Sequence, residues 1–456
     1  MIHRYTKNGL NFVLDVNSGA VHVLDDIGYA VSGLIDEKMG EQCPPQLVEA
    51  LPQYSADAVR EAYDELYELK KAGQLFAADD YIDVGSYIPV DAPVKALCLH
   101  VAHDCNLRCQ YCFAATGDFG QGRKIMPPEI ARKAIDFVVA RSGQRHNIEV
   151  DFFGGEPLMA WDTVVQTVDY ARSIEQAAGK KFRFTITTNG LLLDEDKRRY
   201  INENMDNCVL SIDGRPDTND EFRKTVSGAG SYDVIVPNFK ALVDARDPAL
   251  DYYARGTFTA HNLDFADDVV HIADAGFDRL SVEPVAADPG SGYELTEADL
   301  PRIKAEYDRL TDIIVERRKA GKPFSFFHFM VDLEQGPCVV KRLRGCGAGY
   351  EYVAVTPDGD IYPCHQFVGK EEFKQGNILD QSFDMDIAQT FAEMNIYTRP
   401  KCQTCWAKFY CSGGCSASNY NANRDMNDSY ELGCELERKR LECAIYLKAV
   451  EKGCAD

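Results

Sequence analysis

The 456-residue sequence lacks several features that mark other classes of protein. No apolar run approaches the roughly 18 residues that a membrane span needs, and the first eight residues contain no apolar signal core. Basic residues are few: 49 Lys and Arg stand against 72 Asp and Glu, which gives a net charge of −23. Such a charge does not favour binding to a phosphate backbone. We therefore expect a cytoplasmic protein with no membrane span and no nucleic-acid partner.

Cysteine, in contrast, is abundant. The chain has 16 cysteines, and disulfides are disfavoured in the reducing cytosol. The surplus therefore indicates metal or cluster ligation, or redox chemistry. With 45% hydrophobic residues the chain can bury sizeable cores, and its length predicts about three domains.

Residues 1–90 have the pattern of a small separate module. Two strand-like runs, 11–16 and 20–24, flank a turn signal, and an amphipathic helix is expected over residues 56–72. Residues 75–77 are a further candidate strand. A hairpin and helices of this size predict a winged-helix-like fold, with a purely structural extension as the alternative. The module holds 6 Lys and Arg against 15 Asp and Glu, so a basic peptide fits its charge better than DNA does.

Residues 91–295 have a different pattern. Strand–helix alternation there predicts a parallel sheet, and six such units predict an α/β fold in the form of a partial (β/α)6 barrel. Active sites of such folds lie at the carboxyl ends of the strands, where several polar motifs of this chain fall. The expected strands are residues 96–102, 148–153, 182–188, 208–213, 253–259 and 280–285.

The remaining chain divides into two parts. A helical connector is expected over residues 296–337, with a long helix near 297–320. Residues 338–456 form a cysteine-dense domain that is expected to be rich in loops, with short strands at 352–355 and 361–362.

The first cysteine motif follows the first barrel strand and has the spacing C-x3-C-x2-C, formed by Cys105, Cys109 and Cys112. Three thiolates on one tight loop can hold three irons of a [4Fe–4S] cluster and leave the fourth iron open. Structural zinc is a competing interpretation, although it takes four ligands, usually in paired C-x2-C units. A buried trio of structural cysteines is the remaining alternative.

This region resembles the radical S-adenosylmethionine (SAM) enzymes, whose signature has an aromatic residue before the third cysteine, as Tyr111 is here. The resemblance implies that the cluster binds SAM. Gly154, Gly155 and Glu156 follow the second strand and resemble the site of the SAM amino group, with Glu156 as a negative partner. Glu283 is expected to reach the same pocket. The other residues that the resemblance assigns to SAM are Thr188, Asn189, Ser211 and Asp213 at the ribose and amino-acid portions, and Arg223 at the carboxylate.

The second set of cysteines resembles the SPASM domain, whose pattern is C-x(9–15)-G-x4-C, then C-x2-C-x5-C-x3-C, then a last cysteine. All seven cysteines and Gly359 match this pattern. The resemblance implies two auxiliary [4Fe–4S] clusters, and thus three [4Fe–4S] clusters in all. The assigned ligands are Cys346, Cys364 and Cys415 for the first, with Cys338 as the candidate fourth, and Cys402, Cys405, Cys411 and Cys434 for the second. Two alternatives stay open: an iron site left free for a substrate thiol in place of Cys338, and structural zinc in place of both clusters.

The opening stretch GLNFVLDVNSGAVHV, residues 9–23, resembles the maturase of the SCIFF peptide ("six cysteines in forty-five residues"). With the core motifs, this resemblance covers nearly the whole chain. It implies an enzyme that joins a peptide cysteine sulfur to an α-carbon, typically of threonine, and so makes a sactipeptide thioether. The implied partner is a short cysteine-rich ribosomal peptide whose leader adds as a strand to the N-terminal module. The expected reductant is a flavodoxin- or ferredoxin-type protein.

Other reactions remain open. One is formylglycine formation, as in the anaerobic sulfatase maturases, and another is carbon–carbon crosslinking. The sulfatase maturases carry an aspartate directly after the cysteine that matches Cys364, so His365 argues against that reaction. His365 is then the candidate catalytic base, with a structural role as the alternative. A protein of a different class, an iron–sulfur electron carrier or a zinc scaffold, would not consume SAM.

Overall fold

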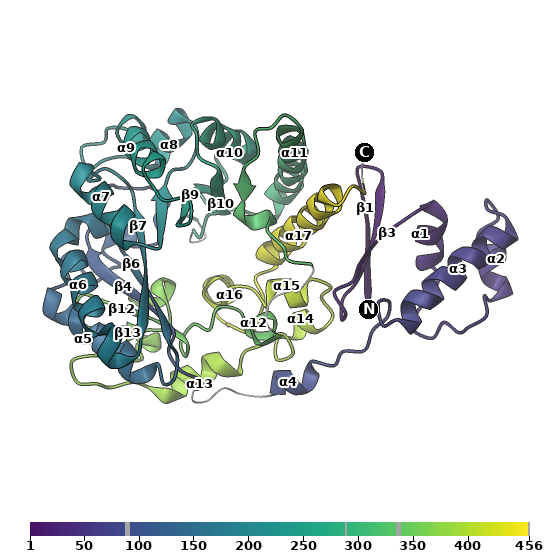
Figure 1. Cartoon of the computed structure of the whole chain (residues 1–456), viewed down its shortest axis with the longest axis horizontal. Helices are drawn as coiled ribbons and strands as arrows, with labels where there is room; N and C mark the ends of the chain where they lie inside the picture. The colour runs from purple at the N-terminus through teal and green to yellow at the C-terminus, as the bar shows by residue number, and fades with distance from the viewer. Residues whose placement is uncertain (87–91, 288–289, 334–338, 455–456) are drawn as a thin grey trace.

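The computed structural model describes residues 1–86, 92–287, 290–333 and 339–454. The barrel lies on the left of Figure 1, the N-terminal module on the right, and the cysteine-rich domain between them. No helix within the described ranges is both long and apolar enough to cross a membrane.

The N-terminal module is built on a three-stranded antiparallel sheet of order β1-β2-β3. The expected hairpin is β2–β3, but the third strand is β1, and residues 75–77 form no strand, so that expectation was wrong. Alternate residues of β2 face opposite ways: Val13 packs under the helices, and Phe12 and Leu14 face the C-terminal domain. The elements are β1 Ile2–Lys7, β2 Leu10–Asp15, β3 Val21–Leu24, α1 Asp26–Ser32, α2 Pro45–Ala50, α3 Ala56–Lys71 and α4 Ile82–Ser86.

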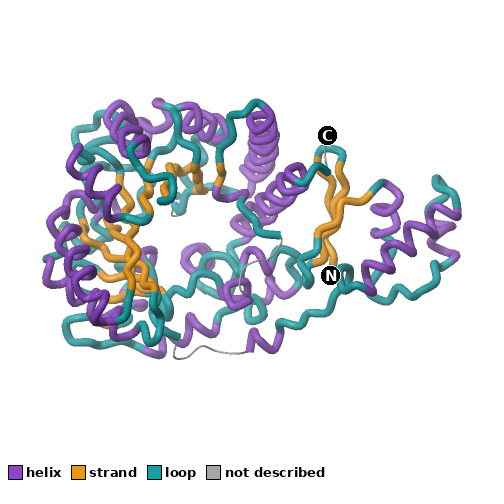
Figure 2. Tube along the Cα trace, in the orientation of Figure 1, coloured by secondary structure: helices purple, strands orange, loops and turns teal. Residues whose placement is uncertain are grey.

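The six expected strand–helix units of the barrel are confirmed. The strands are parallel, with spatial order β10-β9-β8-β7-β6-β4, and helices cover their outer face (Figure 2). On β4, Leu97, Leu99 and Val101 belong to the core that the strands share with these helices. The strands are β4 Ala96–His103, β6 Asn147–Gly154, β7 Lys181–Thr188, β8 Asn207–Ser211, β9 Asp251–Phe258 and β10 Arg279–Pro284. The helices are α5 Pro128–Arg141, α6 Trp161–Ala178, α7 Glu195–Asn204, α8 Pro216–Phe222, α9 Tyr232–Asp244 and α10 Phe265–Asp274.

The barrel sheet does not end at the barrel. β12 of the C-terminal domain pairs in parallel with β4, and β13 and β14 follow it in antiparallel order. β11 pairs with β10 at the opposite end, and β5 pairs with the end of β4. One sheet of eleven strands therefore takes strands from the barrel, the connector and the cysteine-rich domain. The added strands are β5 Lys124–Ile125, β11 Ser325–Phe326, β12 Tyr352–Val355, β13 Asp360–Tyr362 and β14 Gly376–Asn377.

Helix α17, Glu431–Glu451, joins the three parts and was not expected from the sequence, which predicted loops in this domain. It packs against α11, Leu300–Lys319, in the connector and against the N-terminal sheet, where Phe12 and Leu14 contact its Leu441 and Ile445. The shorter helices around the distal cysteines are α12 Val339–Arg344, α13 Met385–Glu393, α14 Pro400–Gln403, α15 Lys408–Cys411 and α16 Ser416–Asn423.

Candidate functional site

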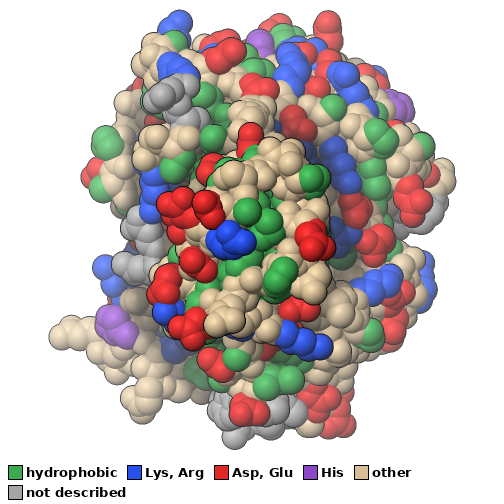
Figure 3. All heavy atoms as spheres, turned by 90° about the vertical axis from the view of Figure 1, so that its right-hand side faces the viewer, with side chains coloured by type: hydrophobic (Ala, Val, Ile, Leu, Met, Phe, Trp, Pro, Cys, Tyr) green, Lys and Arg blue, Asp and Glu red, His purple; other side chains and the backbone are tan. Residues whose placement is uncertain are grey.

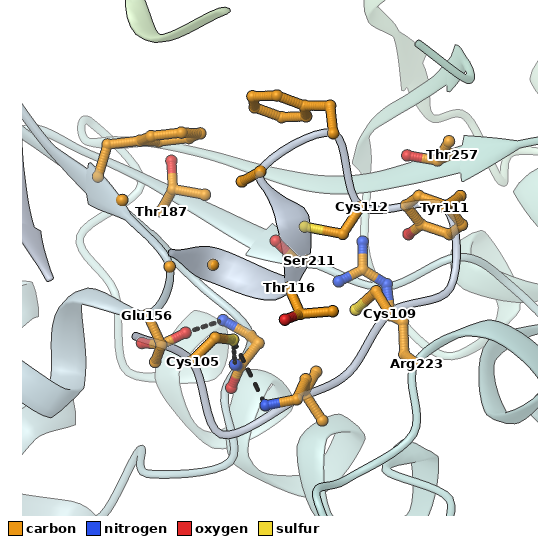
Figure 4. Close-up of a pocket in the computed structure, with 18 of the residues that line it drawn as sticks. Cys105, Cys109, Tyr111, Cys112, Thr116, Glu156, Thr187, Ser211, Arg223 and Thr257 are labelled. Atoms are coloured by element: carbon orange, nitrogen blue, oxygen red, sulfur yellow. Dashed lines mark hydrogen bonds between the residues drawn. The ribbon is translucent and has the colours of Figure 1, made fainter. Parts of the chain in front are cut away.

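The C-x3-C-x2-C loop follows β4 and lines a pocket at the carboxyl ends of the barrel strands (Figure 4). Cys105, Cys109 and Cys112 all face this pocket, whose volume is about 200 Å³. The backbone N–H of Arg108 donates to the carbonyl of Lys224 over 2.7 Å, which fixes the loop against the segment after α8. Burial raises the pKa of both Cys105 and Cys109 to about 12. These thiols therefore stay protonated at neutral pH until a metal centre displaces the proton.

Glycines bring the end of β6 against the cysteine loop. A Cβ on Gly155 would lie 2.1 Å from the carbonyl oxygen of Asp104, and one on Gly154, whose φ is +122°, would lie 2.2 Å from that of Ala102. Both contacts are with backbone, which has little room to shift. The two glycines also line the pocket, so their lack of side chains leaves it open.

Glu156 is buried beside the cysteine loop and connects the ends of two strands. Its Oε1 accepts hydrogen bonds from Leu158 N–H (3.0 Å) and the Thr188 hydroxyl (2.8 Å), and its Oε2 accepts one from Asn189 N–H (2.7 Å). Burial raises the pKa of Glu156 to about 7, and these donors oppose that rise. Because three donors occupy the carboxylate, Glu156 fixes Thr188 and Asn189 in place and keeps little capacity for a ligand.

Asn189 ties the end of β7 to the cysteine loop. Its side-chain amide donates to Asn106 Oδ1 over 2.8 Å and lies 3.6 Å from Cys105 Sγ. Ser211, at the end of β8, also lines the pocket. The residues expected at the SAM site on these two strands therefore meet around one cavity.

Arg223 and Tyr111 line the pocket, whereas Asp213 does not. Asp213 is fully buried; its Oδ2 lies 3.0 Å from Arg223 Nε and accepts a hydrogen bond from the Tyr111 hydroxyl over 2.7 Å. Burial raises the pKa of Asp213, although Arg223 opposes the rise. Asp213, which was expected at the SAM site, thus holds the two side chains that face the pocket and does not itself line it.

One pair of pocket residues was not fully anticipated. Arg255 on β9 forms a bidentate ion pair with Glu283 on β10, with a distance of 3.0 Å from Nε to Oε1. Burial alone would raise the pKa of Glu283, but the Arg255 charge outweighs it and holds that pKa below its ordinary value. The signal was present, since polar residues alternate along β9 at Arg255 and Thr257, and both of these line the pocket.

His365 approaches the pocket from the C-terminal domain. It lines the cavity together with Gln366, its Nδ1 lies 3.4 Å from the Tyr352 hydroxyl, and its ring centroid is 5.0 Å from that of Phe153. Burial lowers the pKa of His365 to about 4, so the imidazole is neutral at physiological pH. The structure thus brings His365 to the wall of the cavity that Cys105, Cys109 and Cys112 line.

The seven distal cysteines lie in two groups. In one group the thiols of Cys346, Cys364 and Cys415 are close enough to interact electrostatically, and Cys338 lies outside the described residues. The other group consists of Cys402, Cys405, Cys411 and Cys434.

The described distal cysteine groups offer only thiol donors. Within the ranges that the structure describes, no three His, Cys, Asp or Glu side chains converge as ligands of one metal ion. In a [4Fe–4S] cluster each thiolate binds a different iron, so its ligands stand apart. The described cysteines form no disulfides, and sets composed only of thiols suit iron–sulfur clusters or zinc.

Comparison with known proteins follows the same division. Residues 99–253 match the radical SAM superfamily, and residues 346–406 match the SPASM iron–sulfur cluster-binding domain. The chain is 28% identical over 339 residues to the mycofactocin maturase MftC of Mycobacterium ulcerans, covering 73% of this chain and 85% of that protein. It is 24% identical over 350 residues to the cysteine-type anaerobic sulfatase-maturating enzyme of Clostridium novyi, covering 73% and 90%. Its fold matches the crystal structure of Streptococcus suis SuiB bound to the precursor peptide SuiA, with a TM-score of 0.54 at 16% identity, over 95% of this chain and 98% of that one.

Proposed function

Since this chain is a radical SAM enzyme with a SPASM domain, we propose that it is a peptide maturase that forms an intramolecular thioether. The bond would join a cysteine sulfur to an α-carbon, typically of threonine, in a short cysteine-rich ribosomal peptide. The observation that carries the proposal is the shared pocket: His365 and Gln366, directly after Cys364, line the same cavity as Cys105, Cys109 and Cys112. A substrate thiol held at the Cys364 group would therefore lie beside the SAM site.

Each cysteine group has a role in this proposal. Cys105, Cys109 and Cys112 hold the cluster that binds SAM. Cys346, Cys364 and Cys415 hold the first auxiliary cluster, whose fourth ligand is Cys338 or the substrate thiol. When bound, the cluster and SAM supply a 5′-deoxyadenosyl radical that removes a hydrogen atom from the peptide. The second auxiliary cluster is assigned to Cys402, Cys405, Cys411 and Cys434. Forming the sulfur–carbon bond from the peptide radical releases one electron, which would leave through the auxiliary clusters, and a flavodoxin- or ferredoxin-type protein is the proposed reductant.

The other pocket residues orient the reactants. Arg223, held by Asp213, offers a buried positive charge to the SAM carboxylate. Ser211 offers a hydroxyl, and Glu156 keeps Asn189 against the cysteine loop. We assign to His365 the acceptance of the thiol proton as the sulfur bonds to carbon, although burial makes it a weak base. The product is two hydrogens lighter than the linear peptide.

We assign leader binding to the N-terminal module. β3 is an edge strand of its sheet and pairs only with β2 among the described residues, so an extended peptide has a strand to join. In Figure 3, where the right-hand side of Figure 1 faces the viewer, carboxylate side chains are spread over the surface. The exposed carboxylates of α3 are those of Asp57, Glu61, Asp64, Glu65 and Glu68. SuiB, of similar fold, is bound to its precursor peptide.

The test is an anaerobic assay with a reconstituted enzyme, SAM, a chemical reductant and a leader-bearing cysteine-rich peptide. We expect 5′-deoxyadenosine, a peptide lighter by two hydrogens, and one cysteine that no longer reacts with an alkylating agent. The triple variant C105A/C109A/C112A should form neither product while keeping the iron of the distal clusters. An intact cluster without 5′-deoxyadenosine would refute the enzyme assignment, and persistent crosslinking in the triple variant would refute the role of the loop.

The second candidate is formylglycine formation, which the relative from Clostridium novyi favours. The same mass spectra separate the possibilities. Formylglycine removes the cysteine sulfur from the peptide, and a carbon–carbon crosslink leaves every thiol open to alkylation. The histidine at position 365, where the sulfatase maturases have aspartate, favours the thioether.

A further inference from the structure

Arg399 is a buried cation that lies between the two groups of distal cysteines. Its side chain is only 3% exposed. It directly precedes α14, which carries Cys402, and the backbone N–H of Cys402 donates to its carbonyl over 3.0 Å. The guanidinium is close enough to interact electrostatically with Cys402 and Cys411 of one group, and with Cys415 and Cys346 of the other.

The partners of this guanidinium are all neutral. Nη1 donates to the carbonyl of Gly413 over 2.5 Å, and Nη2 donates to the Ser416 hydroxyl over 2.9 Å. Nε is buried and has no hydrogen-bond partner among the described residues. Gly413 has a φ of +88°, and a Cβ there would lie 2.2 Å from Nη1. The chain thus leaves room at Gly413 for this side chain.

The charge of Arg399 has no carboxylate partner. Across the described ranges, no Asp or Glu oxygen lies within ion-pair distance of it, whereas Lys408 nearby pairs with Asp79 and Arg223 pairs with Asp213. A buried cation without an anion is costly. The groups around Arg399 that become anionic are the cysteine thiols, once they ligate a metal centre.

We propose that Arg399 is the shared counter-charge of the two auxiliary clusters and raises their reduction potentials. The proposal rests on the assignment of iron–sulfur clusters to both cysteine groups. Reduction of a cluster by one electron adds one negative charge, and a fixed cation in a low-dielectric surrounding favours the more negative state. Because Arg399 faces both groups, its charge acts on both clusters and favours electron transfer into the pair.

The test compares R399Q and R399K in the full-length chain carrying C105A/C109A/C112A, so that only the distal clusters contribute signals. Iron and sulfide per chain are measured first, and reduction potentials then come from a titration with dithionite and mediators, followed by electron paramagnetic resonance. R246Q is the matched control. Arg246 is also buried, with 7% of its surface exposed, and it bonds only to neutral groups, Asn202 among them, but it lies in the barrel away from the distal cysteines.

We expect R399Q to keep its iron. The equilibrium constant for reduction of at least one distal cluster should fall about tenfold, which for one electron lowers its reduction potential by about 59 mV. R399K and R246Q should stay near the parent potentials. Unchanged potentials in an iron-replete R399Q would overturn the proposal. If R399Q loses iron, the R399K variant decides between the two roles. Parent potentials in R399K support a role of the charge. Loss of iron or a lowered potential in R399K shows that Arg399 has only a structural role. Absence of distal iron in the parent would instead refute the cluster assignment.

Discussion

The hydroxyl of Tyr111 donates a hydrogen bond over 2.7 Å to Asp213, a residue 102 positions further along the chain. This bond joins the cysteine loop to the end of β8, and Asp213 also pairs with Arg223. Tyr111 and Arg223, which both face the pocket, therefore share the buried carboxylate of Asp213. A change at Asp213 should disturb the positions of both side chains.

The first prediction concerns this carboxylate. D213N leaves the Arg223 charge buried without its partner, so we expect a loss of stability of about 3–5 kcal/mol and weaker SAM binding. Thermal unfolding of the cluster-free protein and SAM binding to the reconstituted protein measure the two effects. Y111F removes one hydrogen bond and should cost only about 1 kcal/mol. A D213N variant as stable as the parent would contradict the structural role assigned to this pair.

A second prediction follows from the contact between Gly155 and the cysteine loop. In G155A the new methyl group meets the backbone carbonyl of Asp104. The loop must move, at a cost of about 1–3 kcal/mol, and iron loading at Cys105 should fall while the distal clusters load normally. G40A is the matched control, since nothing lies within 4 Å of a Cβ there. Equal loading in both variants would count against the close packing of this loop.

The third prediction is a pH dependence at His328. Arg440 can only donate, so its Nη1, 3.1 Å away, donates to Nδ1 of His328, and Nε2–H of His328 faces the Ser281 hydroxyl at 3.2 Å. Burial, helped by the Arg440 charge, lowers the pKa of His328 to about 3. The unfolded chain, with a histidine pKa of about 6.5, then binds the proton more tightly than the folded chain does. The stability that neutral His328 contributes is therefore fully present above about pH 6.5 and is lost as the pH falls toward 3.

The measurement compares the free energy of unfolding of the parent and of H328N between pH 7 and pH 4. The advantage of the parent should shrink as the pH falls, since asparagine takes up no proton. Parallel curves over this range would rule out a neutral, buried His328.

The fourth prediction concerns the charge of the N-terminal module. Affinity for a basic leader peptide should fall as salt rises, because the attraction between exposed charges is screened. Replacing Glu61, Asp64 and Glu65 on α3 by their amides should weaken binding at low salt and flatten the salt dependence. The same change at Glu195 and Glu203, exposed on α7 of the barrel, is the control. Binding that is indifferent to salt would contradict an electrostatic role for α3.

The barrel strands could be predicted because each is a short apolar run between turn signals and needs no distant partner to be identified. β1 could not, since Ile2–Lys7 is mostly polar. Contacts with the C-terminal domain hold this strand in place: the ring of His3 stacks on Trp406 with 3.7 Å between the ring centroids, and His3 Nε2 lies 3.0 Å from Glu442 Oε1. Helix α17 was not predicted for a similar reason, because the surfaces that bury it come from the connector and from the N-terminal sheet.

The same distinction applies to the candidate site: local sequence patterns could be predicted, and contacts between distant segments could not. The C-x3-C-x2-C loop could be predicted because its spacing is local in sequence, whereas the division of the distal cysteines into two sets rested on the resemblance to the SPASM pattern. The role of Asp213 could not be predicted, because it depends on where the carboxylate lies relative to Tyr111 and Arg223 in the folded protein. Likewise the pair of Arg255 and Glu283 exists only once β9 and β10 lie side by side.

The pairing of β12 with β4 limits how this protein can be divided for study. A fragment that ends in the connector would strip one side of β4 and leave its backbone N–H and C=O groups unpaired. Exposed strands of this kind invite aggregation. Shortened versions of the enzyme should therefore retain the region through β14, whatever their purpose, or else supply a replacement strand.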